Sequence, residues 1–256
     1  MKASKQKVAL VTGASRGIGR AIALRLAKDG FSVVVHYNRN QKGAAATVGE
    51  IEKNDGRAFA VQADLGSLKG VRALFKATDE RLREALGTRE FDVLVNNAGI
   101  SFIAGIEDTS ETQFDQLVAV NMKAPFFIIQ GALPRLRDGG RIINVSSATS
   151  RIAYPEKTAY AMTKAALNTL TLSLAKELGP RGITVNALAP GIVDTDFHGE
   201  WLRNPKARRF AASLTALGRV GLAEDIADVA AFLASPDARW ITGAFINATG
   251  GSLLFG

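Results

Sequence analysis

Short apolar runs alternate with longer segments of helical periodicity along the whole chain. The runs are rich in Val and Ile and almost continuous in apolar character, which is typical of strands buried on both faces of a parallel sheet. This alternation predicts an α/β fold of Rossmann type, in which a doubly wound parallel sheet lies between two layers of helices. We expect strands within residues 7–12, 32–37, 57–64, 91–99, 139–147, 182–191 and 243–251, and helices near 18–28, 43–53, 68–86, 112–137 and 224–233, with a further helix around Tyr160.

The pattern gives no sign of a division into several domains. No linker rich in Pro or Gly interrupts it and no internal repeat is visible, so residues 1–256 are expected to form a single domain. The alternation breaks at about residues 195–221, and we expect this segment to be a lid that closes over a bound substrate. Within it, Phe197, Trp201 and Phe210 either form an apolar wall of the substrate pocket or pack the lid onto the domain.

Composition narrows the possible classes of protein. Apolar residues make up 47% of the 256, and the absence of Cys excludes disulfides, thiolate zinc sites and cysteine nucleophiles. The net charge is +8, but basic and acidic residues are interleaved and no strand carries the aromatics of a base-stacking surface, so no nucleic-acid partner is expected. No apolar run suits a signal peptide or a membrane span, so we expect a cytoplasmic protein without a membrane partner.

The chain has two histidines, His36 and His198. Neither belongs to a ligand cluster such as H-E-x-x-H, so no metal site is expected. His36 is placed at the end of a buried strand, and His198 follows "PGIVDT" in a segment where a surface role is the commoner outcome. This distribution argues against a Ser–His–Asp hydrolase.

A glycine-rich turn joins the first expected strand to the first expected helix. In "VTGASRGIGRAIAL", Gly13, Gly17 and Gly19 allow a tight turn and let the backbone approach a pyrophosphate. The helix N-terminus beyond them adds free amide donors and a partial positive charge. The spacing is longer than in G-x-G-x-x-G, and a tight turn without a ligand is the alternative interpretation.

The end of the second expected strand distinguishes between two dinucleotides. An NAD site usually has a carboxylate there for the adenosine ribose hydroxyls, but "VVVHYNRNQKG" has none. Arg16 in the glycine turn and Arg39 after the strand carry guanidinium groups well shaped for a 2′-phosphate, although either alone could be a solvated surface residue. The sequence therefore predicts NADPH/NADP as the cofactor and disfavours NADH.

Tyr160 and Lys164 lie four residues apart in "TAYAMTKAALNTL", so they share one face of the expected helix. A free tyrosine has a pKa of about 10 and is a poor acid–base catalyst at neutral pH. An ammonium one turn away stabilises the phenolate and lowers that pKa. The pair is expected to give a proton to a carbonyl that is being reduced, or to accept one in reverse, although Y-x-x-x-K by itself recurs by chance in many helices.

Further segments accompany this pair in a fixed order. They are "TGASRGIG", "NNAG" at 96–99, "AVNMKAPFF" with Asn121, "RIINVSS" ending at Ser147, and "PGIVDT". On these motifs the chain resembles the classical short-chain dehydrogenase/reductase family almost from end to end. The resemblance implies a Rossmann-type fold, a nicotinamide cofactor and hydride transfer between a carbonyl and an alcohol.

The resemblance also implies roles for individual residues. Ser147, thirteen residues before Tyr160, would polarise the substrate carbonyl, with Ser146 as its competitor. Tyr160 would be the general acid, Lys164 would bind the nicotinamide ribose and lower the tyrosine pKa, and Asn121 would hold a water that links Lys164 to solvent. The residues implied to bind the cofactor are Gly13, Ser15, Arg16, Gly17, Ile18 and Gly19; Asn38, Arg39, Asp64 and Leu65 at the adenine end; Asn97, Ala98 and Gly99 along the adenosine ribose; Tyr160 and Lys164; and Pro190, Gly191, Ile192, Val193 and Thr195 at the carboxamide.

The sequence thus predicts an NADPH-dependent oxidoreductase that reduces a ketone or 3-oxoacyl-type carbonyl to an alcohol. The expected substrate is a small carbonyl or alcohol compound. An acyl thioester is one option, because the chain looks like 3-oxoacyl-[acyl-carrier-protein] reductases. The segment "GISFIAGIED" and Thr249 depart from the pattern of that subgroup. An NAD-linked sugar or polyol dehydrogenase and a non-catalytic dinucleotide-sensing protein are the alternatives. The resemblance further implies a homotetramer or homodimer, with the helices around Asn121 and Tyr160 at the interface.

Overall fold

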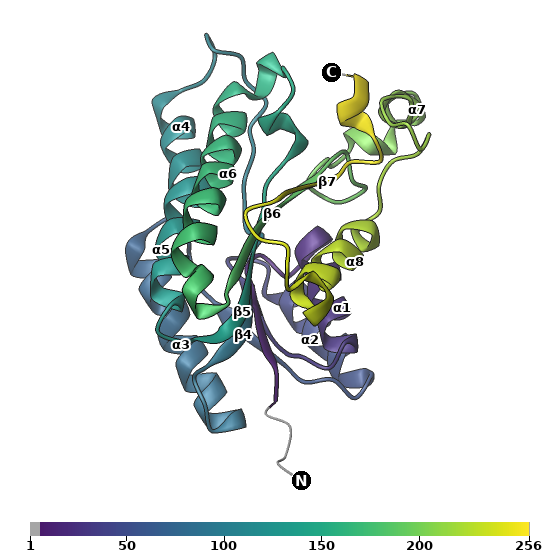
Figure 1. The fold of residues 1–256 in the computed structure, drawn as a ribbon. Helices are drawn as coiled ribbons and strands as arrows, with labels where there is room; N and C mark the ends of the chain where they lie inside the picture. Colours follow the sequence, from purple (N-terminus) through teal and green to yellow (C-terminus); the bar gives the residue numbers. More distant parts are fainter. Residues whose placement is uncertain (1–5, 256) are drawn as a thin grey trace.

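One parallel sheet organises the chain. The computed structural model describes residues 6–255. Residues 1–5 and 256 of the domain predicted over 1–256 therefore lie outside the described part. Within that part, seven strands pair in the order β3-β2-β1-β4-β5-β6-β7 (Figure 1). The strand order reverses between β1 and β4, where open α/β sheets bind their ligands. The strands are β1 (Val8–Val11), β2 (Ser32–Tyr37), β3 (Ala58–Gln62), β4 (Phe91–Asn96), β5 (Leu136–Val145), β6 (Thr184–Pro190) and β7 (Phe245–Ala248).

Helices cover both faces of this sheet, so the predicted three-layer α/β/α fold is confirmed (Figure 1). The helices are α1 (Gly17–Lys28), α2 (Gln41–Lys53), α3 (Leu68–Leu86), α4 (Glu111–Leu117), α5 (Ala124–Ala132), α6 (Thr158–Leu178), α7 (Pro205–Ser213) and α8 (Ala223–Ala234). Residues of α1, α2 and α8 share one apolar core with the sheet, and residues of α3, α5 and α6 share the other. The short helix α7 lies in the segment that was predicted to be a lid.

Burial on both faces explains why the strands are almost continuously apolar. Along β1, Ala9 and Val11 enter the core beneath α1 and α8, whereas Val8 and Leu10 enter the core beneath α3 and α5. Because successive side chains of a strand point to opposite faces, a strand between two helical layers has no solvent face that could be polar. The signal that predicted a parallel sheet therefore has a direct structural cause.

The prediction of one continuous helix over 112–137 was wrong. The segment consists of α4, a π-helical turn over Val118–Lys123, and α5, which ends at Ala132. Pro134 follows that end, and proline lacks the N–H that a continuing helix needs. The chain then enters β5 at Leu136, which pairs with Phe91 of β4.

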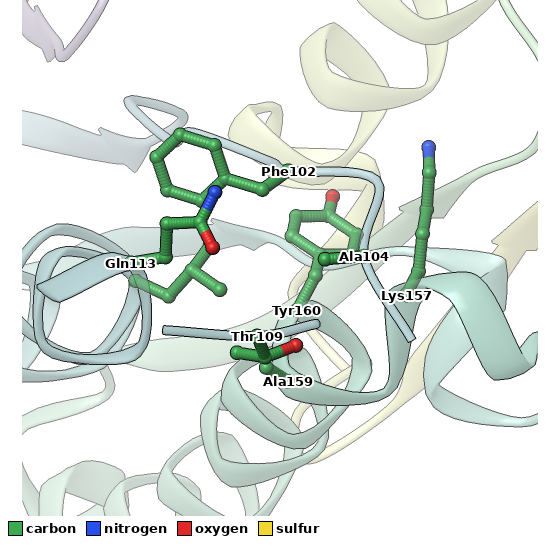
Figure 2. Close-up of a pocket in the computed structure, with 8 residues that line it drawn as sticks. Phe102, Ala104, Thr109, Gln113, Lys157, Ala159 and Tyr160 are labelled. Carbon is green, nitrogen blue, oxygen red and sulfur yellow. The ribbon is translucent and has the colours of Figure 1, made fainter. Parts of the chain in front are cut away.

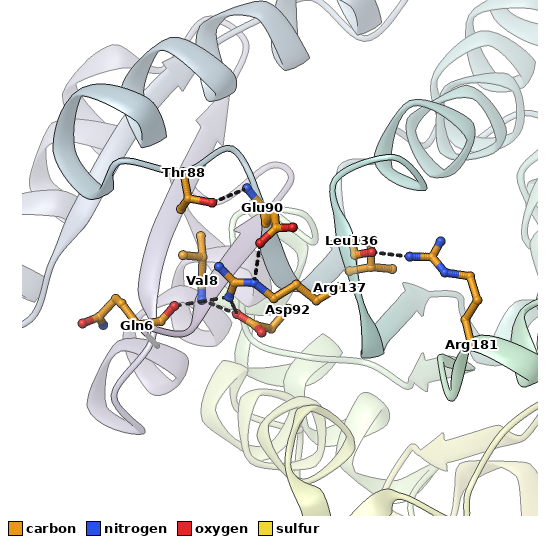
Figure 3. A network of polar contacts seen from close by, with 8 residues as sticks. All are labelled: Gln6, Val8, Thr88, Glu90, Asp92, Leu136, Arg137 and Arg181. Atoms are coloured by element: carbon orange, nitrogen blue, oxygen red, sulfur yellow. Dashed lines mark hydrogen bonds and ion pairs between the residues drawn. The ribbon is translucent and has the colours of Figure 1, made fainter. Parts of the chain in front are cut away.

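The amino ends of the central strands are joined by a polar network (Figure 3). The mostly buried guanidinium of Arg137 on β5 donates to Asp92 Oδ2 at 2.7 Å and to Glu90 Oε2 at 3.2 Å, and Asp92 Oδ2 also accepts the Val8 N–H at 2.8 Å. Three neighbouring strands are thereby fixed at the edge of the sheet opposite to the carboxyl ends. A mostly buried, multiply bonded arginine is harder to replace than an exposed ion pair.

Among the described residues 6–255, no helix is both long enough and apolar enough to cross a membrane. No group of three or more His, Cys, Asp or Glu side chains in that part of the chain is arranged to hold a metal ion.

Candidate active site

A single groove runs along the carboxyl ends of the strands, and it brings nearly all the predicted site residues together. Every residue predicted to bind the cofactor lines this groove, from Gly13 to Thr195, as do Ser147, Tyr160 and Lys164. Asn121 is the exception, because it is buried behind the groove. The carboxyl edge at a reversal of strand order is where open α/β sheets place their ligands.

The glycine turn after β1 is shaped for a close backbone approach. Gly13 and Gly17 have φ angles of 65° and 55°, a region that L side chains rarely adopt. A Cβ on Gly13 would lie 2.9 Å from Ala98 Cα, and one on Gly19 would lie 2.3 Å from the Gly13 carbonyl oxygen. Helix α1 begins at Gly17 with no side-chain cap and no acidic residue in its first turn. Its free N–H groups and its dipole therefore suit the phosphates of a dinucleotide.

At the adenosine end, the described residues suit NADP better than NAD. Arg16 and Arg39 are exposed at the rim of the groove, and no carboxylate follows directly on β2. Arg16 lies 3.9 Å from Asp196, an exposed and therefore weak ion pair that leaves the guanidinium accessible. Asp64 lies after β3, where its Oδ1 accepts the Gly66 N–H at 3.0 Å and the Asn38 amide at 3.3 Å.

Tyr160 is buried at the centre of the groove, one turn before Lys164 on α6. Burial raises the pKa of the phenol to about 12, and a hydrogen bond from Ser147 offsets only part of this effect. The Lys164 ammonium lies 5.7 Å from the phenol ring centroid and donates to the Val145 carbonyl at 2.8 Å. Burial lowers the pKa of Lys164 to about 8.

These values correct one expectation. Lys164 was predicted to lower the tyrosine pKa, whereas in the cofactor-free protein the pKa of Tyr160 is raised. The physical reason is that desolvation of the buried phenol penalises phenolate, and the ammonium is turned toward the Val145 carbonyl. A phenol that stays protonated is a proton donor over the whole physiological pH range.

The structure separates the two candidate serines. Ser146 is buried and its hydroxyl donates to Asn168 Oδ1 at 2.6 Å. Both serines line the groove, but the Ser147 oxygen accepts both the N–H and the hydroxyl of Thr149, at 3.2 and 2.9 Å. Because its acceptor positions are occupied, the Ser147 hydroxyl is free to donate its own proton, either to the Tyr160 phenol or to a carbonyl in the groove.

Asn121 lies on the π-helical turn between α4 and α5. Its amide is bonded to the backbone of Ile100 on both sides, accepting from the N–H and donating to the carbonyl, each at 2.9 Å. Asn121 Oδ1 and Lys164 Nζ both lie next to Gly99, at 3.3 and 3.5 Å from the place where a Cβ would stand. A π-helical turn is frequently found at functional sites, and here it aims Asn121 at the loop that follows β4.

Two residues that the sequence did not single out hold the glycine turn in place. His36 is buried at the end of β2; its Nδ1 accepts the Gly13 N–H at 3.0 Å, and its Nε2 contacts the Ala63 carbonyl at 3.1 Å. Burial lowers the pKa of His36 to about 4, so the ring is neutral and can accept from Gly13. Thr12 Oγ1 accepts the N–H groups of Asn97 and Ala98, at 2.9 and 3.0 Å.

Asn97 lines the groove and is also bonded to the glycine turn. Its side-chain amide donates to the carbonyl of Thr12 at 2.8 Å and to that of Gly13 at 3.2 Å. No periodicity or spacing in the sequence reveals these contacts, because the residues that meet belong to β1, β2 and the end of β4 and are brought together by the sheet.

The other end of the groove has aromatic walls. Phe197 lies 6.3 Å from Tyr160 between ring centroids, and the rings of His198 and Trp201 continue from it at 5.7 and 6.1 Å. Phe210 on α7 lines the same groove and is exposed. Figure 2 shows a small pocket beside the phenol, lined among others by Phe102 and Ala104 of the loop after β4 and by Tyr160 and Lys157. This half of the groove suits a flat, apolar molecule.

Comparison with known proteins agrees with this geometry. A family model described as "Enoyl-(Acyl carrier protein) reductase" matches residues 13–252. An uncharacterized oxidoreductase of Methylorubrum extorquens is 44% identical over 246 residues, which cover 96% of this chain and 97% of that protein.

Solved structures of two ketoreductases are also similar to the chain. The angucycline C-6 ketoreductase LanV with bound NADP has a TM-score of 0.94 at 49% identity and covers 97% of this chain and 96% of its own; a second LanV structure contains NADP and rabelomycin. The reductase LugOII, which catalyses keto-reduction at C1 in lugdunomycin biosynthesis, has a TM-score of 0.95 at 49% identity over 98% of this chain and 100% of its own.

Proposed function

The chain belongs to the classical short-chain dehydrogenase/reductase family, and we propose that it reduces a ketone on a polycyclic aromatic substrate. It is an NADPH-dependent oxidoreductase that acts between carbonyl and alcohol groups. The observation that supports a polycyclic aromatic substrate is a row of aromatic rings that continues from the buried phenol of Tyr160 through Phe197, His198 and Trp201. Such a wall fits a flat ring system better than a flexible acyl chain.

In the proposed reaction, NADPH supplies the hydride and the protein supplies orientation and the proton. The Ser147 hydroxyl donates a hydrogen bond to the ketone oxygen, which polarises the carbonyl. Tyr160 then gives its proton to that oxygen as negative charge develops on it. Lys164 binds the nicotinamide ribose, and Asn121 holds the loop after β4 and positions a water from which the phenol regains its proton.

The remaining cofactor residues fall into three groups. The glycine turn and the start of α1 bind the pyrophosphate, and Arg16 and Arg39 bind the 2′-phosphate. The segment from Pro190 to Thr195 holds the carboxamide, and it passes directly beside Gly17, where a Cβ would lie 3.4 Å from Thr195 Cβ. The segment 195–221 is the lid over the substrate half of the groove, and a bound ring system excludes water from the phenol when the lid closes.

We further propose that the protein is a cytoplasmic homo-oligomer. Large apolar side chains are exposed along the helices around Asn121 and Tyr160, among them Met122, Phe126, Met162 and Leu172. A second copy of the chain would cover them. Sedimentation of the purified protein tests this point, and a monomer at micromolar concentration would contradict it.

The function is tested by following NADPH oxidation with rabelomycin, 2-tetralone and acetoacetyl-CoA as substrates, each repeated with NADH. We expect turnover of the ring ketones with NADPH and little turnover of the thioester. Fast reduction of acetoacetyl-CoA alone would instead make the protein an acyl-thioester reductase, and the aromatic wall would then be part of the packing of the lid.

A further inference from the structure

Lys157 stands at the start of α6, three residues before Tyr160. It belongs to a short 3-10 turn, Pro155–Lys157, in which its own N–H donates to the Tyr154 carbonyl at 2.9 Å. The loop after β4 is bonded to the same turn, because the Ala104 N–H donates to the Glu156 carbonyl at 2.9 Å. The backbone of Lys157 is therefore held in a fixed position beside the phenol.

The side chain of Lys157 faces the substrate half of the groove. Its ammonium lies 6.0 Å from the ring centroids of both Tyr160 and Phe197, and 5.7 Å from that of Tyr154. In Figure 2 the ammonium of Lys157 and the hydroxyl of Tyr160 point to the same side. The side chain is partly buried, and this burial lowers the pKa of Lys157 despite the Coulomb attraction of Glu156.

Within residues 6–255, the Lys157 ammonium has neither a hydrogen bond nor an ion pair within 4 Å. In the same half of the groove, Lys164 donates to a carbonyl and Arg151 stacks on Phe245 at 3.8 Å. The other arginines that line the groove, Arg16 and Arg39, lie at its adenosine end. Ring faces attract the Lys157 charge but accept none of its N–H groups in a strong hydrogen bond. A partly desolvated ammonium with free donors gains most from an anionic acceptor.

We propose that Lys157 recognises an acidic oxygen of the substrate, a phenolate or enolate carried on the ring system whose ketone is reduced. The inference rests on the proposed function and narrows its substrate to hydroxylated aromatic ketones. The Lys157 ammonium lies 6.0 Å from the ring centroid of Tyr160. One flat molecule can therefore place its ketone oxygen at Tyr160 and its acidic oxygen at Lys157 while its ring rests against Phe197.

The test compares an anionic and a neutral ligand that share one ring system. The first is 2-hydroxy-1,4-naphthoquinone, whose hydroxyl is ionised at neutral pH, and the second is its neutral 2-methoxy ether. Calorimetry with the NADP⁺-loaded protein at pH 7 gives both dissociation constants. We expect the wild type to prefer the ionised ligand and Lys157→Met to reduce this preference by about 10- to 100-fold, as loss of a charge-assisted hydrogen bond predicts.

Two variants serve as controls. Lys157→Arg keeps the charge and is expected to retain most of the preference, whereas Lys176→Met removes an exposed lysine at the far end of the same helix and is expected to leave the ratio unchanged. The proposal is overturned if the wild type shows no preference, or if Lys157→Met weakens both ligands by the same factor. The second result would show that Lys157 only packs against the rings.

The binding test does not depend on turnover, so its failure is distinguishable from failure of the proposed function. If the wild type reduces 2-tetralone with NADPH but shows no preference for the ionised ligand, the reductase assignment stands and the Lys157 site is refuted. If the wild type prefers the ionised ligand through Lys157 but reduces no ketone, the anion site stands and the proposed reaction is refuted.

Discussion

Replacing Lys164 by Met removes a charge that the fold buries at a cost. The pKa of Lys164 falls from 10.5 to about 8 because the ammonium is fully desolvated. A shift of this size corresponds to about 3 kcal/mol between the charged and neutral forms. Below pH 8 the folded protein bears this whole penalty, and above the unfolded pKa both states hold a neutral lysine and the penalty disappears.

The stability of the wild type should therefore contain a contribution that rises with pH. Between pH 8 and 10.5 the unfolded lysine binds more protons than the folded one, so the free energy of unfolding increases through this window. Lys164→Met lacks the contribution. Loss of the hydrogen bond to the Val145 carbonyl costs the variant about 1 to 3 kcal/mol, but this cost is independent of pH.

The measurement is urea unfolding of the cofactor-free proteins at pH 7 and pH 10, followed by circular dichroism. The free energy of unfolding of Lys164→Met minus that of the wild type should be larger at pH 7 than at pH 10 by about 2 to 3 kcal/mol. Lys176→Met, which removes an exposed lysine from the same helix, should show no such change. An equal difference at the two pH values for Lys164→Met would refute the idea that burial lowers the pKa of this lysine.

Three other predictions concern the cofactor and the reaction. Tyr160→Phe should bind NADPH as the wild type does, measured by fluorescence titration, but lose turnover by about 10²- to 10⁴-fold because no proton donor remains; turnover within tenfold of the wild type would remove the phenol from the mechanism. Arg39→Ala should raise the KM for NADPH by about tenfold and leave that for NADH unchanged, since it loses only a phosphate contact; an equal rise for both cofactors would mean that Arg39 does not read the 2′-phosphate. His36→Ala should weaken NADPH binding by about tenfold with little change in kcat, because it frees the Gly13 N–H in the glycine turn; unchanged affinity would show that the turn holds its shape without the imidazole.

Features that depend on local pattern were predictable from the sequence. The helix over Leu68–Leu86 begins after Ser67, which caps it, and ends at Gly87 with a φ of 65°, and both signals can be read from the residue types. The end of α5 also had a readable signal in Pro134, which the apolar pattern of the segment obscured. Strand positions followed because burial on both faces leaves a continuous apolar run.

The π-helical turn around Asn121 and the contacts of His36 could not be predicted in the same way. Neither has a local sequence signature: the π turn forms where the helix packs against the loop after β4, to which Asn121 is bonded at Ile100. His36 reads as one more residue of a buried strand until the sheet places it 3.0 Å from the Gly13 N–H. Contacts between segments distant in sequence determine both features, and such contacts cannot be predicted from the local pattern of residue types.

The protonation of Tyr160 is the consequence of tertiary structure that bears most directly on function. Spacing along a helix suggested that Lys164 would make the phenol more acidic, but burial acts on the phenol more strongly and raises its pKa to about 12. At pH 7 the phenol is therefore protonated. Alcohol oxidation needs that phenolate as a base, whereas ketone reduction needs the protonated phenol as an acid. The environment that the fold builds around Tyr160 therefore keeps the phenol in the protonated form that ketone reduction requires.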